Sequence, residues 1–169
     1  GLTLIGRERE SRKWLHWSHA WAHRIVLERR KDIAPRLLDF ERDGDLTIVN
    51  APGEDVEQVA DLIARVKQAN LLPPKNAIGV DAAGIGDVVD ELTSTERDIK
   101  IEQIVAISQG WKLNGAIKTT ERKLAGGEMV HGGSRMMNWC AGNARIVQNG
   151  NAISITKQAS GNAKIDPLM

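Results

Sequence analysis

The stretch AIGVDAAGIGDVVDEL, residues 77–92, decides the fold class of this chain. Its apolar run at residues 78–80 predicts a buried strand, which ends at Asp81. The apolar residues from Ile85 to Leu92 recur at the period of a helix, and the next apolar run, residues 104–107, predicts a second strand. Because strand, helix and strand follow in that order, we expect a parallel pair with a right-handed crossover, and hence an α/β fold.

Outward from this stretch, predicted strands and helices alternate along the chain. Further strands are expected at residues 2–6, 14–21, 46–49, 143–147 and 152–157, and further helices at residues 24–43, 55–69 and 114–125. The first two strands, and the last two, are joined by polar segments that predict hairpins. The glycine-rich residues 126–133 predict a mobile loop.

Composition predicts one domain and excludes several classes of protein. The chain has 169 residues, of which 41% are hydrophobic, enough for one sizeable core. Lys and Arg number 23 and Asp and Glu 22, so net charge alone indicates no polyanionic partner. There is no apolar run near the roughly 20 residues of a membrane span, and no secretion signal. A single cysteine, Cys140, rules out an internal disulfide. We expect an intracellular protein.

Two aspartates far apart in the sequence, Asp81 and Asp166, are the main candidates for a metal site. Each stands at the edge of a regular element, and ligands of open α/β sheets bind beyond the carboxyl ends of strands. Small residues follow Asp81, at positions 82–84, and leave room for a phosphate backbone. Mg²⁺ takes oxygen ligands and keeps several waters, so one or two carboxylates with substrate phosphate oxygens make an adequate site.

Structural roles compete with these chemical ones. Asp81 has about equal odds of capping the helix after it, and Asp166, which precedes Pro167, is an even better cap. Capping and metal binding are compatible, because one carboxylate oxygen can serve each purpose. Asp87 is a solvated residue or an auxiliary ligand. Cys140 is expected to be a small buried residue rather than a nucleophile.

The four histidines leave alternatives open as well. His16, His19 and His23 would share one face of a helix and invite a zinc interpretation, but that register disappears if the segment is a strand. His131 lies in the glycine-rich segment. Its candidate roles are a base, a metal neighbour or a DNA contact, against a loop histidine that faces solvent.

Several segments together resemble the nuclease half of the large terminase subunit of tailed bacteriophages and prophages. The resemblance covers most of the chain from about residue 14, and the segments that carry it, in order, are residues 77–87, 127–139 and 143–147, Lys157 and residues 164–169. The closing Lys164-Ile165-Asp166-Pro167 makes the set fairly specific.

The resemblance implies an RNase H-like fold, a mixed central sheet flanked by helices, that cuts double-stranded DNA with two Mg²⁺ or Mn²⁺ ions. Asp81 matches the second acidic ligand of that family and Asp166 the third. The first is expected on a strand before residues 2–6, outside this sequence, as is the ATPase half, since no phosphate loop occurs in the chain. Residues 1–169 are then expected to be a single nuclease domain fragment.

Basic residues near the second aspartate are candidates for contact with DNA phosphates. Lys157 stands near the end of a strand that leads toward Asp166, where it would hold the scissile or a neighbouring phosphate. Arg135 and Lys164 belong to the same basic carboxyl half. A solvated surface is the competing interpretation for each of them.

The sequence therefore predicts a metal-dependent endonuclease that cuts concatemeric DNA with little sequence specificity. Two alternatives stay open, a domain that binds DNA or protein partners without catalysis, and a phosphate-binding α/β domain. The resemblance further implies a portal protein and a small terminase subunit as partners of the full-length protein, and the cytoplasm of a bacterial host as its location.

Overall fold

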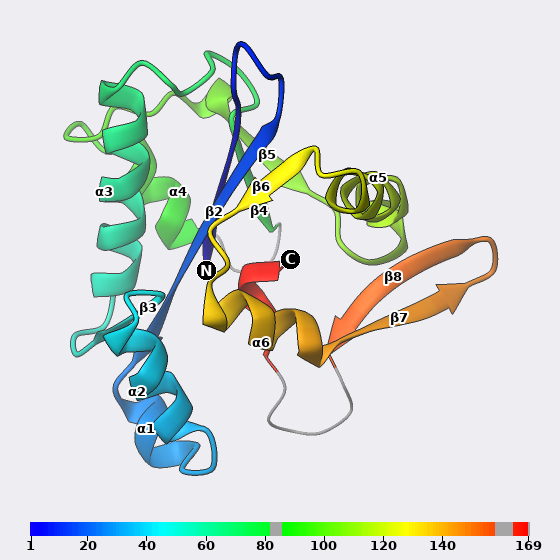
Figure 1. Cartoon of the computed structure of the whole chain (residues 1–169). Coiled ribbons are helices and arrows are strands. Elements are labelled where there is room, and N and C mark those ends of the chain that lie inside the picture. Colours follow the sequence, from blue (N-terminus) through cyan, green and yellow to red (C-terminus); the bar gives the residue numbers. More distant parts are fainter. Residues whose placement is uncertain (82–85, 158–163, 169) are drawn as a thin grey trace. The chain divides into compact units, whose positions relative to one another are not determined.

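The computed structural model of the chain describes residues 1–81, 86–157 and 164–168 (Figure 1). The chain divides into two compact units: unit 1 comprises Gly1–Asn50 and Gly110–Met169, and unit 2 comprises Ala51–Gln109. Since compact units occur within domains as well as between them, the single domain expected from the sequence stays a prediction.

The sheet of unit 1 is built on strand β2, Trp14–His23. It pairs antiparallel with β1, Leu2–Arg7, which confirms the first predicted hairpin. It also pairs in parallel with β3, Leu46–Val49, and with β6, Met129–His131. The sheet is therefore mixed, and residues in register on neighbouring strands share one of its faces.

Helices α1 (Ile25–Arg29), α2 (Ala34–Arg42) and α6 (Arg135–Asn143) accompany this sheet. Two helices occupy residues 24–43, where the sequence predicted one, and Pro35 lies in the first turn of α2, where its missing N–H costs no hydrogen bond. The core of the unit joins Ala20 of β2 and Leu46 of β3 to Phe40 of α2 and Cys140 of α6.

The glycine-rich segment differs from the predicted loop. Residues 129–131 form strand β6, which pairs with Trp14–His16, so the prediction of a loop throughout residues 126–133 is wrong. Gly127 (φ 67°) and Gly133 (φ 69°) lie on either side of β6 in the left-handed region, where glycine is favoured. Helix α6, which the sequence did not predict, begins at Arg135, after Gly133 and the N-cap residue Ser134.

The remaining elements of unit 1 follow the prediction closely. Helix α5 spans Asn114–Ala125 after a 3₁₀ turn, η2, at Gly110–Leu113. Strands β7 (Ala144–Asn149) and β8 (Ala152–Lys157) form the second predicted hairpin. A last 3₁₀ turn, η3, spans Asp166–Leu168 and lies against α6 and β2.

Unit 2 contains the strand, helix and strand from which the fold class was predicted. Strand β4 (Ile78–Asp81) is parallel to β5 (Ile104–Ile107), with helix α4 (Gly86–Thr93) and a 3₁₀ turn, η1 (Ile101–Gln103), between them in the chain. Helix α3 (Glu54–Gln68) packs against α4. The parallel pairing and the long amphipathic helix are both confirmed.

Among the described residues, the helices are all too short or too polar to cross a membrane.

Candidate functional site

Asp81 is the last residue of β4, at the carboxyl end of the parallel pair. It is exposed and lies in register with Ile107, the last residue of β5. The pairing is close at Gly79, where an added Cβ would come within 2.9 Å of Cγ1 of Ile107. The structure thus confirms the predicted position of Asp81 at a strand end. The small residues Ala82, Ala83 and Gly84 fall outside the described residues.

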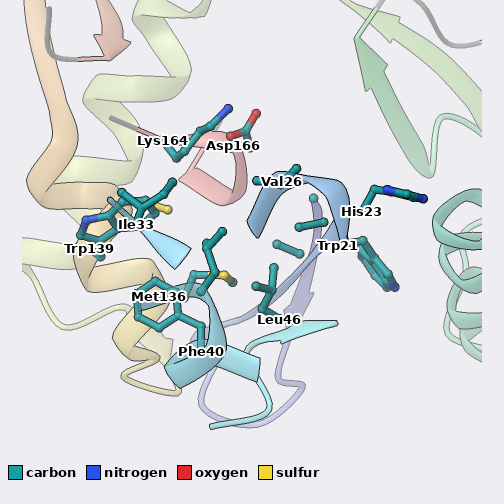
Figure 2. Close-up of a pocket in the computed structure, with 15 residues that line it drawn as sticks. Trp21, His23, Val26, Ile33, Phe40, Leu46, Met136, Trp139, Lys164 and Asp166 are labelled. Carbon is teal, nitrogen blue, oxygen red and sulfur yellow. The ribbon is translucent and has the colours of Figure 1, made fainter. Parts of the chain in front are cut away.

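Asp166 is the first residue of η3, in unit 1, and its side chain is exposed. It lines a partly open cavity of about 300 Å³, whose lining comes mainly from β2, α2 and α6 (Figure 2). Figure 2 shows Lys164 and Asp166 at one end of this cavity and the apolar side chains of Phe40 and Met136 toward the other. A carboxylate and an ammonium group therefore flank an apolar hollow.

Helix α6 anchors the segment that carries this pair. The side-chain amide of Asn143 donates a hydrogen bond to the carbonyl of Lys164 (3.0 Å). Beyond the pair, the Leu168 N–H donates to the carbonyl of Ile165 (2.8 Å), and Leu168 packs on the core. Asp166 is thus held from both sides in the chain.

Cys140 lies on α6 and lines the same cavity as Asp166. Burial raises the pKa of its thiol to about 11, and the negative charge of Asp166 raises it further in the same direction. A thiol with such a pKa stays protonated at neutral pH and is a poor nucleophile. Its burial confirms the prediction of a small buried residue.

The other candidates lie in different surroundings. Lys157 ends β8 opposite Ala144 and is exposed, but it does not line the cavity. Arg135, the first residue of α6, forms an ion pair with Asp43 (2.8 Å). Of the basic candidates, Lys164 is the one that the cavity brings together with Asp166.

The histidines correct two expectations. His131 ends strand β6 rather than lying in a loop, and its register partner is His16 of β2. Because residues 14–23 form a strand, His16 points to one face of the sheet and His19 and His23 to the other, so the helical zinc interpretation is wrong. His19 instead stacks on Trp17 (5.7 Å between ring centres).

The donors at the two aspartates are carboxylate oxygens on exposed side chains, a set that suits a hard divalent ion. Within the part of the chain that the structure describes, no three His, Cys, Asp or Glu side chains cluster closely enough to hold a metal. An ion at either aspartate would complete its shell with water and with phosphate oxygens of a substrate.

Sequence reasoning missed two residues of the site. His23 lines the cavity and its Nε2 lies 2.8 Å from the carbonyl oxygen of Asn50, whereas the sequence pattern offered it only a zinc-binding or a structural role. Asn143, which anchors Lys164, had no assigned role. The glycines before residue 134 favoured a loop, so the sequence did not indicate helix α6. No short-range signal links Asn143 to Lys164, 21 positions later.

Comparisons with known proteins bear on the fold. No protein-family model matches the sequence, and no curated protein matches it significantly. Among solved structures, the crystal structure of the HK97 bacteriophage large terminase matches with a TM-score of 0.73 at 20% identity, over 98% of this chain and 34% of that one. The chain has the fold of part of a phage large terminase. It spans about a third of that terminase's length. This likeness confirms the mixed α/β, RNase H-like fold class.

Proposed function

We propose that this chain is the metal-dependent endonuclease part of a phage or prophage large terminase, which cuts concatemeric double-stranded DNA. The observation that carries the proposal is an exposed aspartate, Asp81, at the carboxyl end of a parallel strand in a chain with a terminase fold. In open α/β sheets that end of the strands is where ligands bind.

A second observation supports the same proposal. Asp166, the other predicted ligand, starts a short turn that α6 holds in place, and it shares a cavity with Lys164. A carboxylate can hold a metal ion that assists phosphodiester cleavage, and a lysine beside it can bind a phosphate of the substrate.

The roles of the residues follow from their chemistry. Asp81 and Asp166 hold divalent ions through carboxylate oxygens, with Mg²⁺ or Mn²⁺ as the expected species. When bound, such ions activate a water and stabilise the leaving oxygen at phosphorus. Lys164 and Lys157 bind phosphates near the cut. Because none of these contacts reads a base, cutting is expected to depend little on sequence.

The test is plasmid nicking by the full chain with Mn²⁺ or Mg²⁺. We expect Asp81→Asn and Asp166→Asn each to reduce nicking by at least about 100-fold, since a neutral amide is a much weaker ligand for a hard cation. Asp90→Asn and Asp32→Asn, at exposed positions of α4 and of the α1–α2 connection, are matched controls and should cut like the original chain.

Two results would oppose the proposal. Equal nicking by both site variants and the original chain would exclude these aspartates as ligands. Tight duplex binding without any nicking would instead favour the alternative, a domain that binds DNA or protein partners without catalysis.

The proposal extends to the setting of the protein. A large terminase works with a portal protein and a small terminase subunit, and we propose both as partners of the full-length protein in the cytoplasm of a bacterial host. Co-purification of these two proteins with the full-length chain from infected or induced cells would test this extension.

A further inference from the structure

Away from the cavity, aromatic and basic side chains gather on one face of the sheet of unit 1. The pairing registers place Arg7, Trp14 and Met129 in one row across β1, β2 and β6, and Ile5, His16 and His131 in the next. Residues in register share a face, so these two rows lie side by side. We call Arg7, Trp14, His16, His131 and Lys123 of α5 the basic face.

Trp14 holds two of these cations in place. The guanidinium of Arg7 lies 5.3 Å from the centre of the indole ring, and the ammonium of Lys123 lies 5.4 Å from it. Cation–π contacts of this kind restrict long, flexible side chains to one place. Lys123 is also paired with Glu128 (3.2 Å), whereas Arg7, whose Nε donates to the carbonyl of Arg12 (3.1 Å), has no ion-pair partner among the described residues.

The second row presents two imidazoles to the same surface. Burial lowers the pKa of His16, and the nearby His131 lowers it further, because two imidazolium ions repel each other. Nδ1 of His131 accepts the N–H of Gly133 (3.2 Å), so the neutral ring carries its hydrogen on Nε2. An Nε2–H donor suits an anion, whereas a metal ion needs that nitrogen without its hydrogen.

The basic face lies on the same side of β2 as Ala20 and Ala22, whereas Trp21 and His23, which also line the cavity, have the opposite phase. Successive side chains of a strand point to opposite faces of the sheet. Ala20 and Ala22, which line the cavity, therefore point to the same face as Trp14 and His16. His16 is four residues from Ala20 along the strand, or about 13 Å at about 3.3 Å per residue. On a duplex that distance corresponds to about four base pairs.

We propose that the basic face docks the phosphate backbone of double-stranded DNA beside the site that holds Asp166. This inference rests on the proposed function for the identity of its ligand. Arg7 contacts one phosphate, and His16 and His131 share another. Ile5 of β1 is in register with His16, and the charged groups of the neighbouring row are Arg7 of β1 and Lys123 of α5, whose ammonium pairs with Glu128.

A phosphate beside His16 favours the protonated form of that imidazole, which burial and the nearby His131 disfavour in the free protein. DNA binding is then coupled to proton uptake, so the affinity rises as the pH falls through the histidine range, from about pH 7.5 to about pH 5.5.

The experiment measures the affinity of the full chain for a short labelled duplex by fluorescence anisotropy. EDTA prevents cleavage, and each variant is first checked by thermal unfolding. We expect the double variant His16→Gln/His131→Gln to lose most of the pH dependence and to bind about tenfold more weakly at about pH 5.5, as for the loss of one charge-assisted hydrogen bond. Arg7→Gln should reduce the slope of log affinity against log salt by about 1.

Matched controls lie elsewhere in the same unit. His19→Gln lies on the opposite face of β2 and can keep a hydrogen bond to Thr47. Arg29→Gln, at the end of α1, removes an exposed charge away from the basic face. Both should bind the duplex like the original chain.

The outcomes separate this inference from the proposed function. If the chain nicks plasmid but the double histidine variant binds as tightly as the original at every pH, the docking face is overturned and the nuclease stands. If the histidines control duplex binding in a chain that never nicks, the docking face stands and the nuclease falls. Equal losses in His19→Gln would also overturn the docking face.

Discussion

At the scale of single residues, the site depends on two carboxylate side chains and on one glycine, Gly79, which has no side chain. Asp81 can be placed beside Ile107 because Gly79 lets β4 and β5 approach closely. Asp166 is placed by hydrogen bonds to its neighbours in the chain. In both cases the carboxylate is exposed while the backbone that carries it is fixed.

Gly79→Ala tests the close approach in unit 2. The added Cβ would meet Cγ1 of Ile107 at 2.9 Å, which is too short for an ordinary carbon contact. We expect a loss of about 1 kcal/mol in the free energy of unfolding, the low end for overpacking because Gly79 is exposed and Ile107 only half-buried, measured by urea titration. The same change in an Ile107→Ala background should cost much less.

Gly86→Ala is the matched control for that substitution. Gly86 starts α4 and has open space where a Cβ would lie. Alanine should leave stability unchanged there or raise it by up to about 1 kcal/mol. An equal loss at both glycines would contradict the steric account.

At the scale of elements, α6 links the core to the site. Met136 and Cys140 pack in the core of unit 1, and Asn143 at its far end holds the carbonyl of Lys164. Two N–H groups in the first turn of α6 have hydrogen-bond acceptors outside the helix. The Ser134 hydroxyl accepts the Met137 N–H (3.1 Å), and a carboxylate oxygen of Asp45 accepts the Met136 N–H (3.1 Å). The position of Asp166 therefore depends on the stability of one short helix.

Loss of the cap should weaken α6 in a graded way. Ser134→Ala removes the hydroxyl acceptor and is expected to lower the free energy of unfolding by about 1 kcal/mol, whereas Ser134→Asp keeps an acceptor and should cost little. Chemical denaturation of both variants measures the difference. Similar losses in the two would show that the cap is not the reason.

At the scale of the whole molecule, the described residues form two compact units, each with one of the two aspartates. Unit 1 contributes Asp166 with its cavity and the basic face, and unit 2 contributes Asp81 at the end of its parallel strand pair. The free energy of unfolding of the whole chain should also depend on pH, because burial lowers the pKa of both His16 and His19.

Stability should therefore rise with pH across the histidine range. A histidine whose pKa is lower in the folded chain binds fewer protons there than in the unfolded chain, so raising the pH favours the folded state. We expect the urea midpoint to increase from about pH 5 to about pH 7, the range in which unfolded histidines lose their protons. In the His16→Gln/His19→Gln variant this increase should be smaller, and an unchanged increase would assign it to other groups.

Much of the secondary structure could be predicted because it follows from short-range pattern. The β4–α4–β5 order, the two hairpins and α3 each have an apolar period that local sequence displays. Strand β6 and helix α6 could not be predicted in this way. The glycines around residues 126–133 indicate turns, and only pairing with β2 makes Met129–His131 a strand.

The amino-acid sequence by itself determined the fold class and the two aspartates as candidates, since strand ends and apolar periods are local properties. Only the tertiary structure decided which side chains meet. It placed Lys164 with Asp166 at one cavity, paired Arg135 with Asp43, and set His131 beside His16. The physical reason is that a side chain's partners depend on which strands pair and in which register, and long-range pairing leaves no periodic signal in the sequence.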